Sequence, residues 1–255
     1  MPTKKPKLCS VGDTSVADAA APADRLSALP DTLLHHVLSF LRAWEVAPTC
    51  VLLRRWRHLW ASAPCVWRLG RHRAPPEELS RFVYRFLLER EASAPVDTLR
   101  LLSSPASDYI EEDYTTVDVG MWIQFAIKRR VRVIHLTAHP RYKVFSNLER
   151  VNVSSYHLEH LKLSGCRLSE KKLRQLCFHC PSLEVLDLKG CYLDASEISS
   201  SSLKRLSIVE CRIIRDLTIA APNLLSLHCV KPHHRAPLFE NLGSLATATV
   251  VLDDS

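Results

Sequence analysis

The 255-residue chain contains only 6 glycines, and it has no stretch of about 18 consecutive apolar residues. So little glycine excludes the collagen and Gly/Ser-linker classes, and the missing apolar stretch excludes a membrane-spanning helix. The N-terminal segment lacks the apolar core of a secretory signal peptide. Global disorder is excluded too, because 47% of the residues are hydrophobic and 24% are charged. We expect one or two folded domains and no membrane contact.

Leucine is the most informative residue that is present, because it fills 39 of the 255 positions, a share far above ordinary usage. The 9 cysteines are an odd number, and several of them lie inside strand-like apolar runs. We interpret them as reduced, buried thiols, because disulfides are rare inside the cell. The expected location is therefore the nucleus, the cytoplasm or both.

Positive charge is concentrated in the first third of the chain, whose net charge is +7 overall. Residues 1–90 hold 14 Lys and Arg against 8 Asp and Glu, whereas the remaining residues hold 20 against 19. Seven arginines lie between Arg42 and Arg73, where Glu45 is the one acidic residue. A nucleic acid and an acidic protein both fit such an excess, so the charge count leaves these two kinds of partner open.

The N-terminal part is predicted to consist of a polar tail and three short helices. Residues 1–24 show no apolar period and are predicted to be disordered. Asp31 is the expected N-cap of the first helix, and two further helices are predicted over Trp44–Leu53 and Arg54–Ala61. The apolar face of the first helix comprises Leu33, Leu34, Val37, Leu38 and Leu41.

Two longer helices are predicted further along the chain. Residues 66–95 are predicted to form a helical linker, with an amphipathic helix over residues 75–91 that begins at a Pro-Pro pair. Its apolar stripe comprises Leu79, Phe82, Val83, Phe86 and Leu87. A second helix is expected over residues 115–130. Its apolar face comprises Met121, Trp122, Phe125 and Ala126.

A six-residue frame, apolar-x-x-apolar-x-apolar, recurs through the rest of the chain. Each copy predicts a strand that buries alternate residues, and three cysteines follow such strands where the chain turns away. Period, frame and cysteine together are typical of leucine-rich repeats. Copies begin at Val96, Val131, Leu158, Leu183, Leu203, Leu224 and Leu245, and the three cysteines are Cys166, Cys191 and Cys211. A further match at Leu148 lies too close to the next copy to be assigned.

The segment from Leu29 to Trp60 resembles an F-box. That family has Leu-Pro, a helix ending in Ile/Val-Leu-Ser-x-Leu, an acidic residue and then a basic Arg-x-Trp-Arg. The counterparts here are Leu29-Pro30, Val37–Leu41, Glu45 and Arg55-Trp56-Arg57. With the repeats that follow it, such as LKRLSIVECRI from Leu203, the chain resembles plant-type F-box/leucine-rich-repeat proteins. Members of that family usually continue into further repeats or an FBD-type domain beyond the point where this sequence stops.

The resemblance implies an α/β protein with a three-helix F-box over residues 25–65 and leucine-rich repeats over residues 96–255. The repeats form a short solenoid, whose curved parallel sheet has helices or irregular segments on its convex side. The implied function is that of a substrate receptor in a Skp–cullin–F-box (SCF) ubiquitin ligase. The F-box docks on a Skp-type adaptor, and through it on a cullin scaffold, while the repeats hold an unknown protein target. Such a receptor is not an enzyme and has no cofactor.

The resemblance also assigns residues to the two sides of the F-box. Those expected to bind the adaptor are Leu29, Pro30, Leu33, Val37, Leu38, Val46 and Trp56. Those expected in the core of the F-box are Leu34, Leu41, Leu59 and Trp60.

The repeat frame predicts which side chains face the target. Because the strands bury alternate residues, the positions between them lie on the concave side of the sheet. These positions are mostly small and mixed in charge, which favours a polar protein surface as the partner. The residues expected to bind the target are His160, Lys162, Asp187, Lys189, Arg205, Ser207 and His228.

Other functions have weaker support in the sequence. Cys177 and Cys180 form the one C-x-x-C motif, whereas structural zinc needs two ligand pairs, so no bound metal is expected. Cys177 lies on the apolar face of a predicted helix over Ser169–Cys180 and is expected in the core, with Cys180 on the surface. The sequence has no G-x-S-x-G, P-loop or H-E-x-x-H motif. Two alternatives remain. One is nucleic-acid binding by the basic region Arg42–Arg73, where tryptophans alternate with arginines, and the other is a leucine-rich scaffold outside any ligase.

Overall fold

The computed structural model describes residues 28–41, 59, 66–69, 81, 84, 88, 96–102, 116–137, 148 and 151–252. The predicted tail over residues 1–24 and the predicted helix Trp44–Leu53 lie outside these residues, as does Arg54–Ala61 apart from Leu59. The three-helix F-box therefore stays a prediction beyond its first helix. The predicted solenoid is described almost throughout.

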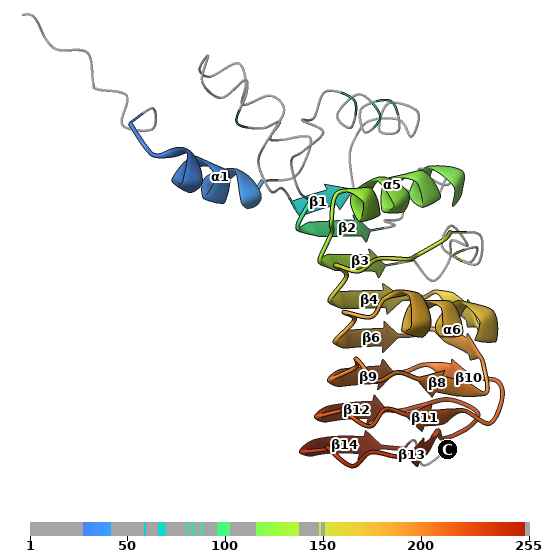
Figure 1. Cartoon of the computed structure of the whole chain (residues 1–255). Coiled ribbons are helices and arrows are strands. Elements are labelled where there is room, and N and C mark those ends of the chain that lie inside the picture. Colours follow the sequence, from blue (N-terminus) through green and yellow to red (C-terminus); the bar gives the residue numbers. More distant parts are fainter. Residues whose placement is uncertain are drawn as a thin grey trace, which may run out of the picture.

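The main sheet has eight parallel strands that stack in the order β1-β2-β3-β4-β6-β9-β12-β14, like the rungs of a ladder (Figure 1). Each strand except β1 coincides with a predicted copy of the apolar frame, including the early copy at Val96 and the weak one at Leu245. The strands are β1 (Val66–Leu69), β2 (Thr98–Leu102), β3 (Val133–Thr137), β4 (His160–Ser164), β6 (Val185–Lys189), β9 (Arg205–Val209), β12 (Ser226–Val230) and β14 (Thr247–Val251).

Neighbouring strands pair at equivalent positions of their repeats. Leu161 of β4 lies opposite Leu186 of β6, which in turn lies opposite Leu206 of β9. Since successive side chains of a strand point to opposite faces, this pairing collects the leucines of all copies into rows on one face. The inward residues of β2 to β12 are Leu99, Leu101, Ile134, Leu136, Leu161, Leu163, Leu186, Leu188, Leu206, Ile208, Leu227 and Cys229, and all are buried.

Helices and short strands cover the inward face of the sheet (Figure 1). Helices α5 (Thr116–Lys128) and α6 (Glu170–His179) follow β2 and β4 in the chain. Short strands before and after α6 stack into two parallel sheets, β10-β7-β5 and β13-β11-β8. Their bounds are β5 (Arg167–Ser169), β7 (Tyr192–Asp194), β8 (Glu197–Ser199), β10 (Arg212–Ile213), β11 (Thr218–Ala220) and β13 (Leu238–Glu240). The solenoid prediction is confirmed.

The turns after β4, β6, β9 and β12 repeat one hydrogen-bond pattern. Gly165 and Gly190 adopt φ of 69° and 58°, and their N–H groups donate to the last carbonyl of the next strand, at 2.9 and 2.8 Å. Glu210 and Lys231 occupy the same position with φ of 52° and 48° and donate in the same way, at 2.8 and 2.7 Å. Residues other than glycine tolerate a left-handed φ poorly. The hydrogen bonds between stacked turns must therefore stabilise this backbone conformation at Glu210 and Lys231.

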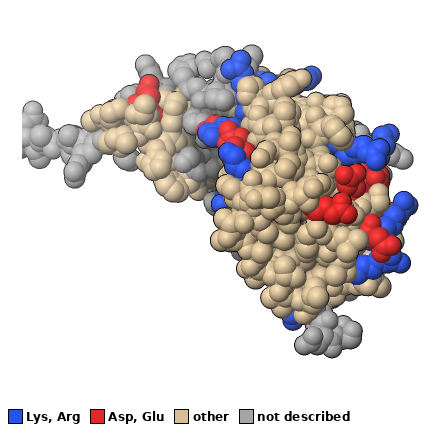
Figure 2. All heavy atoms as spheres, turned by 60° about the horizontal axis from the view of Figure 1, so that its bottom comes forward, with Lys and Arg blue, Asp and Glu red and all other residues tan. Residues whose placement is uncertain are grey.

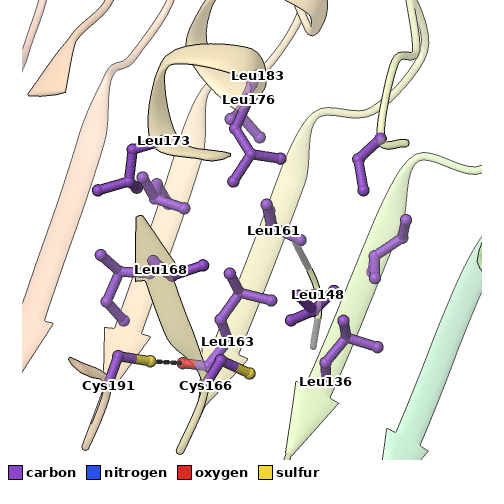
Figure 3. Packing of buried hydrophobic residues seen from close by; sticks show 14 of the residues in the cluster. Leu136, Leu148, Leu161, Leu163, Cys166, Leu168, Leu173, Leu176, Leu183 and Cys191 are labelled. Carbon is purple, nitrogen blue, oxygen red and sulfur yellow. Dashed lines mark hydrogen bonds between the residues drawn. The ribbon is translucent and has the colours of Figure 1, made fainter. Parts of the chain in front are cut away.

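A buried cysteine follows that turn in three consecutive repeats, as predicted. The thiol of Cys191 donates to the carbonyl of Leu163 at 3.4 Å, which Figure 3 shows beside Cys166 and Leu168. Cys211 makes the equivalent bond to Leu188, also at 3.4 Å. The thiols of Cys191 and Cys211 thus supply a weak donor to a carbonyl of the preceding repeat, whereas that of Cys166 donates to the carbonyl of Ser164 of its own repeat at 3.6 Å.

Helix α5 lies where a helix is predicted, but one residue of its buried face differs. Trp122, Ile123 and Ala126 are buried against the sheet, whereas Met121 is 53% exposed. The buried residues are spaced by three and four, so they share one face. Met121 lies about 100° around the helix from Trp122, on the side away from Ile123 and Ala126, and therefore points outward.

Helix α6 begins at a Ser169 cap, whose hydroxyl accepts the N–H of Lys172 at 3.3 Å. The prediction that Cys180 lies on the surface is wrong, because Cys180 is fully buried, whereas Cys177 is half-buried and packs against the core. Cys180 lies just past the last helical residue and its thiol donates to the carbonyl of Val153 at 3.7 Å. The chain has turned under the helix by that point, which the C-x-x-C spacing alone does not reveal.

The unassigned match at Leu148 is not a strand. Leu148, Val151 and Val153 are all buried in the main core, but none of them belongs to a strand. Figure 3 shows Leu148 among Leu136, Leu161 and Leu163. This segment therefore fills the core between β3 and β4 without adding a strand.

The predicted helical linker over residues 66–95 is wrong at its start. Val66–Leu69 forms strand β1, which pairs in parallel with β2, with Trp67 opposite Leu99. Later in this segment Tyr84 is helical, and its hydroxyl donates to the carboxylate of Asp118 in α5 at 2.6 Å. The sheet therefore begins one strand earlier than the frame predicts.

We predict that Leu186→Ala or Leu206→Ala lowers the free energy of unfolding by about 2–5 kcal/mol, because each leaves a cavity in the stacked leucine rows. The outward neighbour Asp187 provides the matched control, since Asp187→Ala is expected to change stability by less than about 0.5 kcal/mol. Urea unfolding of the three variants measures the loss in free energy of unfolding for each. Equal losses at Leu186 and Asp187 would contradict the assignment of the inward rows.

Candidate protein-binding surfaces

Helix α1 (Asp31–Ser39) begins directly after Pro30. The carbonyl of Pro30 accepts the backbone N–H groups of Leu33 and Leu34, at 3.0 and 3.1 Å. Pro30 is the N-cap and Asp31 is the first helical residue, so the predicted Asp31 cap is wrong by one position. The carboxylate of Asp31 still lies in the first turn, where the helix dipole favours a negative charge.

One apolar stripe of α1 faces the interior. Leu34 and Leu38 are fully buried and cluster with Leu59, while Leu29 and Leu41 pack against them. Leu34 and Leu38 are four residues apart and therefore share one face of the helix. The core positions predicted for Leu34, Leu41 and Leu59 are confirmed. Leu29 and Leu38 are predicted to face the adaptor, but Leu38 lies in this small core and Leu29 packs against it.

A second apolar stripe of α1 faces outward. Leu33 is 49% exposed, Val37 is 41% exposed and Phe40 is 67% exposed. Their spacing of four and three places them along one side of the helix, beside the exposed Pro30. We name these four residues, Pro30, Leu33, Val37 and Phe40, the α1 stripe. Exposed apolar side chains gathered in this way mark a protein-binding surface.

One exposed residue of this surface is not predicted, and two predicted adaptor residues lie outside the described residues. Phe40 is absent from the predicted set, although its spacing of three from Val37 is a signal for the same face. Val46 and Trp56 lie outside the described residues. The same holds for most of the basic region Arg42–Arg73, so the nucleic-acid alternative stays a prediction.

The second surface is the side of the main sheet that faces away from α5 and α6. We name it the open face. Its residues alternate with the buried rows, and the parallel pairing aligns them across the strands. They are Thr98, Arg100, Val133, His135, Thr137, His160, Lys162, Ser164, Val185, Asp187, Lys189, Arg205, Ser207, Val209, Ser226, His228 and Val230.

All seven residues predicted to bind the target lie on the open face, and all of them are exposed or half-buried. The frame of alternating leucines is thus sufficient to place them. Whether they bind a target stays a prediction. Arg100 is absent from the predicted set, although it is the middle residue of the strand in the copy that begins at Val96.

The middle row of the open face runs from Arg100 through His135 and Lys162 to Asp187. His135 is half-buried between the two cations. Burial, followed by the positive charges of Arg100 and Lys162, lowers the pKa of His135 from 6.5 to about 4. His135 is therefore neutral at physiological pH, and it contributes no positive charge to the row.

The cations of the open face stand apart from the ion pairs of the solenoid. Among the described residues, ion pairs lie at the strand starts, as in Lys204 with Glu184 at 2.6 Å, or on the side of the short strands, as in Arg215 with Asp194 at 2.8 Å. Figure 2 shows charges of both signs gathered along one side of the solenoid, whereas the end formed by β13 and β14 is largely uncharged. None of these pairs includes an open-face residue.

Cys177 and Cys229 of the solenoid are poor nucleophiles. Burial raises the pKa of Cys177 to about 12 and that of Cys229 to about 11, so neither forms the reactive thiolate at neutral pH. Within the described part of the chain, no three His, Cys, Asp or Glu side chains are placed to hold a metal ion. No helix there has the length and apolar character that crossing a membrane requires.

The comparisons with known proteins agree with this architecture. Residues 125–248 match the family model of the leucine-rich repeats of the FBD-associated F-box protein At5g56370. No solved structure matches the chain.

Several curated plant proteins match most of the chain. The F-box protein At5g03100 of Arabidopsis thaliana is 26% identical, over 92% of this chain and 78% of its own length. The F-box/LRR-repeat protein 25 of the same plant is 29% identical, over 83% of each chain. The MEIOTIC F-BOX protein MOF of Oryza sativa subsp. japonica is 31% identical over 83% of this chain, but the chain spans only 47% of that protein. The resemblance inferred from the sequence is confirmed.

We predict that His135 makes the stability of the solenoid depend on pH. Because its pKa is about 4 in the fold and 6.5 as its ordinary value, the unfolded chain binds a proton between these values that the folded chain does not. The contribution of the neutral His135 to the free energy of unfolding is therefore fully present above pH 6.5 and is lost as the pH falls towards 4. Tm measured from pH 7 to pH 4 should fall less steeply for His135→Gln than for the unchanged protein. Parallel Tm curves would contradict the burial of a neutral imidazole.

Proposed function

We propose that this chain, which belongs to the plant F-box/leucine-rich-repeat proteins, is the substrate-recognition subunit of an SCF ubiquitin ligase. The α1 stripe is the observation that carries the proposal. It lies in the segment that resembles an F-box, and its apolar side chains point away from the small core of Leu34, Leu38 and Leu59. The protein acts where SCF ligases act, in the nucleus, the cytoplasm or both.

The α1 stripe provides the adaptor contact. Pro30 fixes its own φ and keeps Leu29 extended, which sets the direction in which the chain enters α1. Leu33, Val37 and Phe40 then present a continuous apolar strip, and burying each of them against a Skp-type adaptor removes apolar surface from water. Val46 and Trp56 are proposed to complete the same contact, and a cullin scaffold is reached through the adaptor.

The solenoid provides the contact with the protein that is ubiquitylated. Its open face is held rigid by the leucine rows beneath it, and stacked repeats of this kind act as stiff interaction surfaces. The receptor binds and orients the target while the rest of the ligase performs the chemistry. Cys177 and Cys229 fit this division, because buried cysteines with raised pKa values are poorly suited to carry ubiquitin as a thioester.

We predict that Val37→Ala, alone or with Leu33→Ala, weakens binding to a purified Skp-type adaptor. Anchors of such interfaces cost about 2 kcal/mol on truncation, or about thirtyfold in Kd. Isothermal titration of the full chain measures the loss. The Tm of Val37→Ala should stay close to that of the unchanged protein, because 41% of this side chain is already exposed.

The neighbouring residue Leu38 provides the matched control for Val37. Leu38 is fully buried, so Leu38→Ala should lower the stability of the F-box, by about 2–5 kcal/mol, without removing an adaptor contact. Lys162→Ala on the open face should leave adaptor binding unchanged. A folded Leu29→Ala/Pro30→Ala double variant or a folded Leu33→Ala/Val37→Ala double variant that binds the adaptor with undiminished affinity would refute the docking surface and the ligase assignment.

A further inference from the structure

We infer that the open face recognises an extended, acidic segment of the target protein, whose Asp and Glu side chains pair with Arg100, Lys162, Lys189 and Arg205. The inference rests on the proposed function, since it names the chemistry of the partner that the solenoid holds. Four observations support it: the distribution of charge, the lack of internal partners, the shape of the face and the residue types it lacks.

Charge is segregated in the solenoid. Residues 91–255 hold nearly equal numbers of cations and anions, 20 Lys and Arg against 19 Asp and Glu. The open face nevertheless carries four of the cations, with Asp187 as its one acidic residue. The balancing acids lie elsewhere, at strand starts and among the short strands. A partner that reaches the open face therefore meets an excess of positive charge, which favours acidic groups and speeds their association.

The open-face cations are not used in holding the fold together. Within the described residues, Lys162, Lys189 and Arg205 take part in none of the ion pairs. Lys162 lies directly opposite Asp187 in the register, yet the two do not form an ion pair of 4.0 Å or less. The Nε of Arg100 is buried and has no hydrogen-bond partner. The charges of the exposed Lys162, Lys189 and Arg205 thus stay available to an incoming carboxylate.

The face is shallow and long rather than deep. Between the cations its side chains are short, as in Thr98, Val133, Ser164 and Val185, so the long Lys and Arg side chains stand above a low floor. The cations extend from β2 to β9, four strand spacings apart in the sheet, or about 19 Å. An extended peptide of about six residues covers that distance, whereas a small molecule would meet one or two of the cations.

The residue types on the open face favour a protein over a nucleic acid. Single-stranded nucleic acids bind surfaces where large aromatic side chains stack on the bases, and none of the described open-face positions is Phe, Tyr or Trp. Asp187 lies in the middle row between Lys162 and Ser207, where it would repel a continuous phosphate backbone. In a peptide, neutral or basic residues can alternate with acidic ones and avoid that repulsion.

The test uses the full chain and a fluorescent octapeptide of alternating Glu and Ser, with an octapeptide of alternating Gln and Ser as the uncharged match. Fluorescence anisotropy should show binding of the Glu peptide that is at least about tenfold tighter than binding of the Gln peptide. Raising the salt to about 1 M should abolish the difference, because the screening length falls to about 3 Å.

Three charge variants test the location of the site. Lys162→Gln and Arg205→Gln should each weaken binding of the Glu peptide by about three- to tenfold, and Asp187→Asn should strengthen it, because a repulsive charge is removed. Lys171→Gln is the matched control, since Lys171 is exposed on α6, on the other side of the sheet, and carries the same charge. It should leave the affinity within about twofold of the unchanged protein.

Several outcomes would overturn the inference. These are equal affinity for the Glu and Gln peptides, no binding of the Glu peptide up to about 1 mM, an equal effect of Lys171→Gln and Lys162→Gln, and tighter, Lys162-dependent binding of a single-stranded oligonucleotide. Adaptor binding by the same variants is measured in parallel. If the unchanged protein binds the adaptor but not the Glu peptide, only this inference is refuted. If the unchanged protein does not bind the adaptor, the proposed function is refuted.

Discussion

Each strand of the main sheet pairs with its neighbours at the same point of its repeat, and the rest of the structure depends on that shared register. Leu161, Leu186 and Leu206 lie opposite one another because their strands are parallel and in phase. A slip of one residue would move every leucine of that strand to the open face. The register thus determines at once which side chains form the core and which meet a partner.

The turns after the strands maintain this register at a local cost. Gly165 and Gly190 adopt positive φ without steric penalty, but Glu210 and Lys231 adopt it with a Cβ present, which costs about 1–2 kcal/mol each. Their N–H groups still donate to the neighbouring strand at 2.8 and 2.7 Å. The in-phase stacking of the strands therefore outweighs the backbone preference of individual residues.

The repeat frame makes most of the solenoid predictable from sequence, because spacing alone determines which residues share a face. The copies at Val96 and Leu245, the buried cysteines and the placement of Lys162 and Asp187 all follow from it. Local spacing is ambiguous in α1, where one apolar stripe contains Leu34 and Leu38 and another contains Leu33 and Val37. Only the contact with Leu59 decides which of the two is buried. Strand β1 has no leucine frame, and it forms because the edge of β2 is available for pairing.

The two candidate surfaces are built by different means. The α1 stripe is apolar and lies on a helix whose own core consists of a few leucines, a kind of module that gains stability from a partner. The open face is polar and charged, and a large core beneath it holds it in place. Such a division suits a protein that connects two partners, since the stiff solenoid can hold one of them while the F-box docks on the other.

Amide hydrogen exchange of the full chain, with and without a saturating Skp-type adaptor, tests this division most directly. The account predicts that amides of α1 exchange at least about tenfold more slowly with the adaptor bound, because binding stabilises the helix by mass action. Amides of β4, β6, β9 and β12 should be unaffected. Unchanged exchange in α1, or slower exchange spread across these strands, would contradict an adaptor surface on α1 that is separate from the solenoid.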